Sequence, residues 1–175
     1  MLFPEAGWLA PAQWPGYLAF GFGLACFAQT DDRRFKVFMA LECAAYALHF
    51  ALLGQATAVA STLLSLGRSL AALHAPVAWR PAAGLGFIAA NLVAGAWLYA
   101  GPLSLLPIAA SIIGTTALFF LQGVAMRVLM LLGTALWLVN NLLVGSVGGS
   151  LLEACLLLAN GLTIVRLLRA GRAAP

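Results

Sequence analysis

Charged residues are scarce in this chain. Of its 175 residues, nine are Lys or Arg and five are Asp or Glu, about 8 % in all, whereas 63 % are hydrophobic. A soluble domain carries about 25 % charged residues, so this chain has too little charge to cover a water-exposed surface. Nucleic-acid binding is also excluded despite the net charge of +4, because the basic residues are too few to follow a phosphate backbone. The composition indicates a membrane protein.

Other absences exclude further classes of function. The three cysteines, Cys26, Cys43 and Cys155, lie in apolar stretches without metal-ligand spacing, so neither a disulfide framework nor a metal site is expected. Catalytic motifs such as GxSxG and HExxH do not occur in the sequence. We therefore expect no enzyme activity, no catalytic residues and no cofactor.

Long apolar runs dominate what is present. A transmembrane helix needs about 20 largely apolar residues. With Gly, Pro and charge as boundaries, the sequence predicts seven such helices, near residues 13–28, 36–53, 56–73, 82–100, 103–121, 126–144 and 149–168. The connections are too short for an extramembrane domain. We therefore predict an all-α polytopic bundle, one integral membrane domain over residues 1–175, surrounded by the lipid bilayer.

The basic residues predict the orientation of this bundle. Cytoplasmic loops collect Lys and Arg, whereas translocated loops do not. Seven spans place all nine basic residues on one side: Arg33, Arg34, Lys36, Arg68, Arg80, Arg127, Arg166, Arg169 and Arg172. We therefore predict an external N-terminus and a cytoplasmic C-terminus.

The chain also shows a weak internal repeat. A shift of 91 residues brings Lys36 onto Arg127, Tyr46 onto Trp137, His49 onto Asn140, Gly54 onto Gly145 and Ser69 onto Asn160. Repeat one covers about residues 13–73 and repeat two about residues 103–168, and the helix near 82–100 links them. Because this linker adds a fourth helix, the two three-helix repeats are predicted to be parallel.

Two prolines occupy equivalent places in the repeats. Pro15 and Pro107 lie in the first helix of each, where a proline removes a backbone hydrogen bond and permits a kink. A paired hinge that opens the two sides alternately is the resulting hypothesis.

Two resemblances add to this interpretation. The stretches QTDDRRFK, ALHFALLGQATA and NNLLVGSVGGSLLEACLLLANGL resemble the bacterial inner-membrane YgjV family over roughly residues 20–168. This resemblance implies location in the bacterial inner membrane more than it implies a function. The arrangement of three, one and three helices is similar to that of the SWEET sugar transporters and the wider PQ-loop group.

The second resemblance implies a pocket near the midplane, lined by an aromatic residue from the second helix of a triple and an Asn from the third. Trp137 and Asn160 match that pattern, and Tyr46 and Ser69 are their counterparts in the first triple. The Pro-Gln dipeptide of the group is missing here, because Gly16 follows Pro15 and Ile108 follows Pro107. A sugar substrate is therefore implied only loosely.

Polar residues within the spans complete the candidate site, because such groups tend to face the bundle interior. Glu42, Tyr46 and His49 share one helix face. Asn140 repeats this position in the second triple, and Asn91 lies near the centre of the linker helix. We assign the substrate-binding residues as Trp137, Asn160, Tyr46, Ser69, Asn140 and Asn91.

The interior charges have two interpretations each. Glu42 and Arg68 lie at similar depth and are predicted to form a structural ion pair, although Glu42 as a substrate or proton site is the alternative. Glu153 could exchange protons with His49 as a coupling site. Alternatively, Glu153 bonds Asn140 or Asn141 and only ties two helices together.

These features predict a small transporter that moves a polar metabolite by alternating access at a midplane pocket between the repeats. The alternative is a non-transporting inner-membrane protein that binds or stabilises a partner membrane complex. The sequence does not specify the substrate, the coupling ion or the direction of transport. It also leaves open whether the protein is a monomer or a homo-oligomer.

Overall fold

The protein is a bundle of α-helices. The computed structural model describes residues 7–27, 32–74, 76–121 and 123–173, and these ranges contain seven α-helices, two short 3-10 helices and no strand. The α-helices are α1 (Gln13–Phe27), α2 (Asp32–Leu52), α3 (Ala56–His74), α4 (Arg80–Trp97), α5 (Leu105–Phe120), α6 (Gly123–Leu143) and α7 (Val147–Ala173). The 3-10 helices η1 (Val77–Trp79) and η2 (Pro102–Ser104) lead into α4 and α5. The predicted all-α bundle is confirmed, and the predicted helix bounds differ from these by a few residues.

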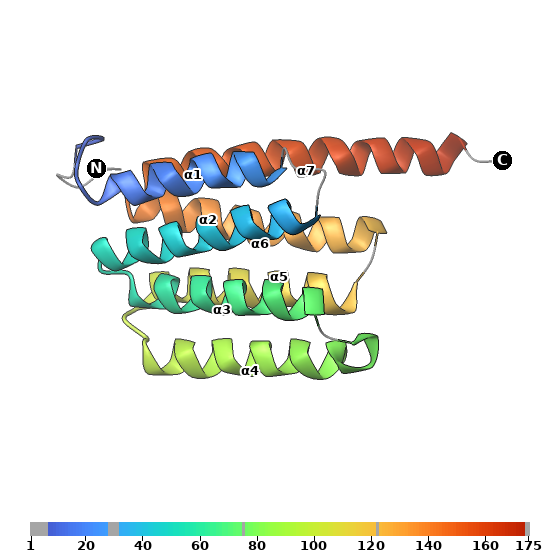
Figure 1. Ribbon diagram of the computed structural model, residues 1–175, viewed down its shortest axis with the longest axis horizontal. Helices are drawn as coiled ribbons and strands as arrows, with labels where there is room; N and C mark the ends of the chain where they lie inside the picture. Colours follow the sequence, from blue (N-terminus) through green and yellow to red (C-terminus); the bar gives the residue numbers. More distant parts are fainter. Residues whose placement is uncertain (1–6, 28–31, 75, 122, 174–175) are drawn as a thin grey trace.

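The helices lie side by side, and each runs antiparallel to the one before it (Figure 1). Within the described ranges, three segments are long and apolar enough to cross a membrane: Pro102–Phe120, Gly123–Leu143 and Val147–Arg169. The apolar part of α2, Val37–Leu52, is shorter. Helix α1 has 15 residues, about 22 Å at 1.5 Å per residue, and lies beside α2 and α7 in the same bundle.

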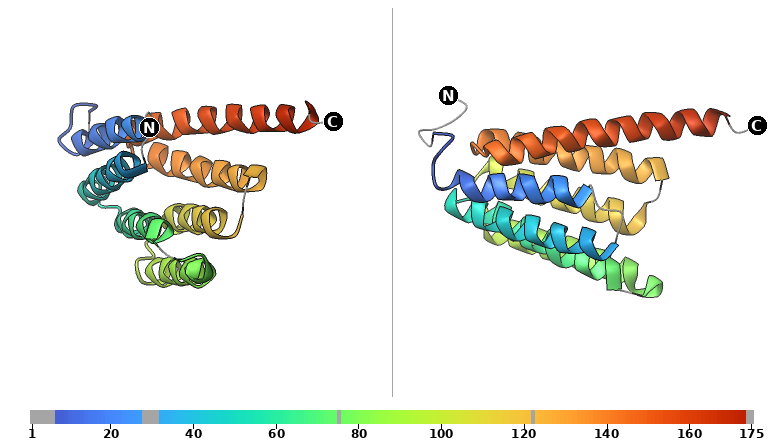
Figure 2. Two further views of the ribbon diagram at one scale, coloured as in Figure 1. Left: turned by 45° about the vertical axis from the view of Figure 1, so that its right-hand side comes forward. Right: turned by 45° about the horizontal axis from the view of Figure 1, so that its top comes forward.

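Six of the helices form a closed ring, and α4 lies outside it. In one half of the ring α2 packs against α1 and α3, and in the other half α6 packs against α5 and α7. The halves meet along two seams, where α1 packs against α7 and α3 against α5 (Figure 2). Helix α4 covers α3 and α5 from outside. The first helix of each triple therefore contacts the third helix of the other.

The turns between α2 and α3 and between α6 and α7 have the same geometry. Gly54 and Gly145 adopt φ angles of 70° and 73°, which glycine reaches without steric cost. In the first turn, the backbone N–H groups of residues 53, 54, 55 and 59 donate to the carbonyl groups of residues 49, 51, 50 and 55. In the second turn, residues 144, 145, 146 and 150 donate to residues 140, 142, 141 and 146, so each bond recurs 91 positions later.

These two turns define one end of the bundle, called the turn end below. The opposite end, called the basic end, is where α2, α4 and α6 begin and where α7 projects beyond its neighbours (Figure 1). The described Arg residues Arg34, Arg80, Arg127, Arg166 and Arg169 lie in the helix segments nearest this end. The side chains of Arg33, Lys36 and Arg172 lie outside the description.

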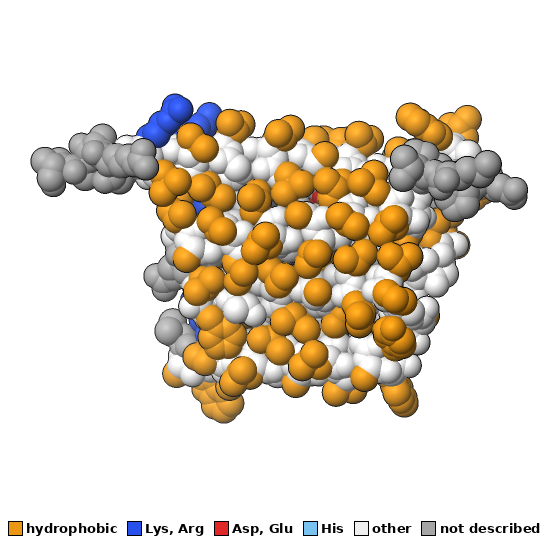
Figure 3. All heavy atoms as spheres, turned by 180° about the vertical axis from the view of Figure 1, so that it is seen from behind, with side chains coloured by type: hydrophobic (Ala, Val, Ile, Leu, Met, Phe, Trp, Pro, Cys, Tyr) orange, Lys and Arg blue, Asp and Glu red, His pale blue; other side chains and the backbone are white. Residues whose placement is uncertain are grey.

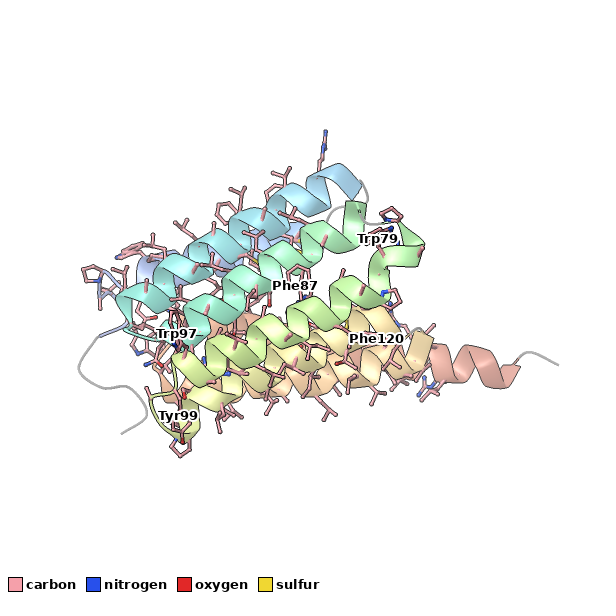
Figure 4. All side chains as sticks on the ribbon, turned by 90° about the horizontal axis from the view of Figure 1, so that it is seen from below. Trp79, Phe87, Trp97, Tyr99 and Phe120 are labelled. Carbon is pink, nitrogen blue, oxygen red and sulfur yellow. The ribbon has the colours of Figure 1, made fainter. Side chains whose placement is uncertain are left out.

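The interior is more polar than the surface. Thirteen polar or charged residues of the described chain are buried, against nine hydrophobic residues and two prolines. This reverses the pattern of soluble proteins and is expected where lipid contacts the outside and small or polar residues join the helices. Hydrophobic side chains spread over the molecular surface, and Lys and Arg gather at one end (Figure 3). Trp79 lies near one end of α4 and Trp97 and Tyr99 near the other, as expected for residues at two membrane interfaces (Figure 4).

Candidate functional site

A cavity of about 220 Å³ lies inside the ring, between α1, α2, α3, α6 and α7. Its lining contains two carboxyl groups, from Glu42 on α2 and Glu153 on α7, and one guanidinium group, from Arg68 on α3. The remaining lining residues are Cys26, Met39, Cys43, Tyr46, Phe50, Thr62, Ser65, Ser69, Trp137, Asn141 and Leu156. Both three-helix units therefore contribute polar and charged side chains to one small space.

Three stacked rings form the aromatic wall of this cavity. Tyr46 and Phe50 lie one turn apart on α2, with ring centroids 5.6 Å apart and planes 11° apart. The ring of Phe50 in turn stacks on Trp137 of α6, with centroids 5.8 Å apart and planes 22° apart. The wall thus crosses from one three-helix unit to the other.

The guanidinium group of Arg68 binds α5 rather than an acidic residue. Its Nη1 donates to Ser111 O at 3.2 Å and to Thr115 Oγ1 at 3.3 Å. The described residues contain no ion pair between Arg68 and Glu42, although both line the cavity. The predicted structural ion pair between Glu42 and Arg68 is therefore not present among the described contacts. The side chain of Arg68 reaches across the α3–α5 seam instead.

Several polar atoms of the lining have no hydrogen-bond partner within the described ranges. These atoms are Tyr46 Oη, Arg68 Nε and both side-chain amide atoms of Asn141, and all of them are buried. A buried polar atom without a partner costs about 1 to 3 kcal/mol, so natural proteins keep few of them. Their concentration around one cavity marks the site as a candidate for binding a polar molecule.

The turn end of the cavity is closed by a hydrogen-bonded network around His49. Nδ1 of His49 donates to Ala12 O at 2.6 Å, because a carbonyl oxygen only accepts, and Ser146 Oγ lies 2.7 Å from Nε2. In the neutral ring Nε2 accepts from Ser146 Oγ, which itself accepts from Gly149 N at 3.2 Å. Both ring nitrogens are therefore engaged.

Gln13 closes the same end across the α1–α7 seam. Its Nε2 donates to Gly145 O at 2.6 Å, and its Oε1 accepts from Val147 N at 3.1 Å. Helix α7 also approaches α1 closely, because a Cβ on Gly148 would lie 2.9 Å from Tyr17 N and nearer still to the carbonyl group of Gly16. The turn end is therefore sealed by bonds and backbone contact among buried residues.

The structure brings together some of the predicted site residues and separates others. Tyr46, Ser69, Trp137, Glu42, Arg68 and Glu153 all line the cavity. Asn160 does not, because its Nδ2 donates to Arg127 O at 2.9 Å near the start of α6. Asn91 lies on α4, outside the ring, and its Nδ2 donates to Phe87 O of the same helix.

Asn140 and His49 also lie outside the cavity lining. Asn140 is buried, with no described partner for its Nδ2, whereas its neighbour Asn141 lines the cavity. Successive residues on a helix point about 100° apart, so only one of the two can face the cavity. Of the two predicted proton-coupling residues, Glu153 lines the cavity together with Glu42, and His49 belongs to the seal.

The two prolines lie at the starts of their helices. Pro15 is the third residue of α1 and Pro107 the third residue of α5. The first four N–H groups of a helix have no partner within it, so neither proline removes a hydrogen bond from the helix interior. The positions are equivalent in the two units, as predicted, but the expected kink within a span is replaced by a helix start.

Sequence reasoning assigned Asn140 rather than its neighbour Asn141 to the site, and it missed Phe50 and the hydroxyl groups of Thr62 and Ser65 as lining residues. Phe50 carries no polar group, and its signal is the spacing of four from Tyr46, which places both rings on one helix face. A polar stripe runs along α3, because Thr62, Ser65 and Ser69 are spaced by three and four residues. This spacing places Thr62 and Ser65 on the same helix face as Ser69, so it is the signal that could have identified them.

Comparisons with known proteins place this chain among bacterial membrane proteins. A sequence profile of the bacterial inner membrane proteins of the YgjV type matches residues 10–171. The chain is 38 % identical over 164 residues to "Inner membrane protein YgjV" of Escherichia coli (strain K12), an alignment that covers 94 % of this chain and 87 % of that one. No solved structure matches the chain.

Proposed function

The chain belongs to the YgjV family of bacterial inner membrane proteins, and from the cavity inside its helix ring we propose that it is a small transporter of a polar metabolite. The solute binds in the cavity inside the helix ring and crosses by alternating access. One observation carries this proposal: a cavity of about 220 Å³ with charged and unpartnered polar groups lies inside an otherwise lipid-facing bundle.

The alternative is a non-transporting protein that stabilises a partner complex. Such a protein gains nothing from polar groups that lack partners in its own interior, because each one weakens the fold. Its interior would be closed by side-chain bonding, as the network around His49 is. The unpartnered atoms of Tyr46 and Asn141 favour the transporter instead.

The helix arrangement supports alternating access. Two three-helix units meet along two seams, α1 with α7 and α3 with α5, and the cavity receives side chains from both units. A rocking movement of one unit against the other opens one end of the ring as it closes the other. With the basic end in the cytoplasm, as the positive-inside rule predicts, the seal around His49 lies on the external side.

Two assays on the purified protein test this proposal. A thermal-shift screen in detergent, with sugars, nucleosides, amino acids, vitamins and organic cations, detects ligands. A ligand at 100 times its dissociation constant stabilises the protein by about 2.7 kcal/mol. Uptake of each stabilising solute into proteoliposomes then distinguishes transport from binding alone.

A pair of variants connects the result to the cavity. Trp137→Ala removes one ring of the aromatic wall, so we expect it to abolish both stabilisation and uptake. Asn160→Ala is the matched control, because the described structure places Asn160 outside the cavity. No stabilisation and no uptake across the library, together with a membrane complex that loses stability when this protein is deleted, would support the partner role instead.

A further inference from the structure

The charges of the cavity point to one class of ligand. Two carboxyl groups, those of Glu42 and Glu153, face one guanidinium group, that of Arg68. No hydrogen bond or ion pair to either carboxyl group occurs among the described residues, whereas Arg68 already donates to two acceptors on α5. The guanidinium group is thus partly satisfied by the protein, and the two carboxyl groups are left for a ligand.

The aromatic wall favours the same class. The rings of Tyr46, Phe50 and Trp137 line the same cavity as the two carboxyl groups. A cation over the face of an aromatic ring is attracted by the ring's quadrupole, most strongly where water is excluded. Acidic groups beside aromatic faces are the surroundings that an ammonium group requires.

We propose that the cavity binds a small organic cation, a molecule with a protonated amino or quaternary ammonium group. The ammonium group lies between Glu42 and Glu153 and against the aromatic wall, and Asn141 and Tyr46 Oη bond the polar remainder of the ligand. This inference rests on the proposed transport function and specifies its substrate. It differs from the sugar that the SWEET resemblance implies, because a sugar brings no positive charge to the two carboxyl groups of the cavity.

The size of the cavity limits the ligand. An apolar cavity of about 150 Å³ accommodates benzene, so a cavity of about 220 Å³ suits a molecule somewhat larger than six non-hydrogen atoms. Choline and ethanolamine are small enough to serve as probes. The compound 3,3-dimethylbutan-1-ol has the shape of choline without its charge and is the matched neutral control.

The test measures binding of these probes to the unaltered protein in detergent by thermal shift and titration calorimetry. We expect choline or ethanolamine to stabilise the protein and 3,3-dimethylbutan-1-ol to have no effect at equal concentration. Glu42→Gln and Glu153→Gln should each lower the affinity for the cation at least about tenfold, and Asn160→Ala should leave it unchanged. The comparison of choline with its neutral analogue needs no variant, so it decides the matter even where a variant does not fold.

The outcomes separate this inference from the transport proposal. Equal binding of choline and its neutral analogue, or cation binding that survives both Gln variants, overturns the cation site. Stabilisation by glucose but not by the cations, abolished in Trp137→Ala, also overturns it but leaves the transporter standing. An absence of binding and uptake for every solute tested refutes both proposals.

Discussion

The close approach of α1 and α7 at the turn end makes Gly148 the most sensitive glycine of the described chain. A Cβ at this position would lie 2.9 Å from Tyr17 N and nearer to the carbonyl group of Gly16. Both neighbours are backbone atoms, which cannot rotate away as a side chain can. Gly148→Ala therefore forces the two helices apart at the place where Gln13 bonds Gly145 and Val147.

The expected loss for Gly148→Ala is about 1 to 3 kcal/mol, the usual cost of inserting a methyl group into a filled contact. Gly161→Ala on the same helix is the matched control, because no atom lies within 4 Å of a Cβ there. Replacing a glycine by alanine inside a helix stabilises it by about 0.5 to 1 kcal/mol, so the two variants should shift the melting temperature in opposite directions. Equal melting temperatures for both variants would refute the close approach of α1 and α7.

Three further predictions follow from single side chains. Ser146→Ala leaves His49 Nε2 and Gly149 N without a partner and should lower the free energy of unfolding by about 1 to 3 kcal/mol, as measured by thermal unfolding. Its control is Ser150→Ala, which should lower the free energy of unfolding far less, because that hydroxyl donates only to Ser146 O one turn earlier. Arg68→Met should change stability by less than about 1 kcal/mol, because Thr115 Oγ1 still donates to Ser111 O at 2.7 Å. A larger loss would mean that Arg68 holds α3 to α5. Because Pro107 removes no hydrogen bond from the interior of α5, Pro107→Ala should leave the melting temperature and proteoliposome uptake unchanged, and slower uptake would support the hinge hypothesis instead.

The fold follows from the sequence because lipid imposes simple rules. A chain in a bilayer must satisfy every backbone group internally, so apolar runs of sufficient length become helices, and Gly54 and Gly145 mark the turns between them. The lining residues on α2 and α3 could be predicted in part, since Glu42, Tyr46 and Ser69 share faces with other polar residues.

The remaining site residues depend on how each helix is rotated about its axis, and a single sequence does not determine that rotation. Asn140 and Asn141 are equally polar, and the packing of α6 turns only the second toward the cavity. Asn160 matches the aligned pattern but lies near the basic end, where it bonds Arg127 O. Arg68 was expected at the cytoplasmic end, and its long side chain instead reaches the cavity and α5.

The two seams of the ring differ in strength at the turn end, and this difference predicts the resting conformation. Opening the turn end separates α1 from α7, which breaks both bonds of Gln13 and the contact at Gly148. Each buried bond contributes about 1 kcal/mol. The bonds of Arg68 to Ser111 and Thr115, by contrast, lie farther along the ring from that end. The protein should therefore rest with its turn end closed.

Ser69→Cys tests this expectation, because Ser69 lines the cavity and is 9 % exposed. In a chain whose cysteines, Cys26, Cys43 and Cys155, are replaced by alanine, a membrane-impermeant maleimide should react faster from the side of the C-terminus than from the opposite side. Adding Gln13→Ala removes both bonds across the α1–α7 seam and should raise the rate from the turn end. Two results would show that this seam does not control access. One is equal labelling rates from both sides in the chain that keeps Gln13, and the other is a turn-end labelling rate that does not change in Gln13→Ala.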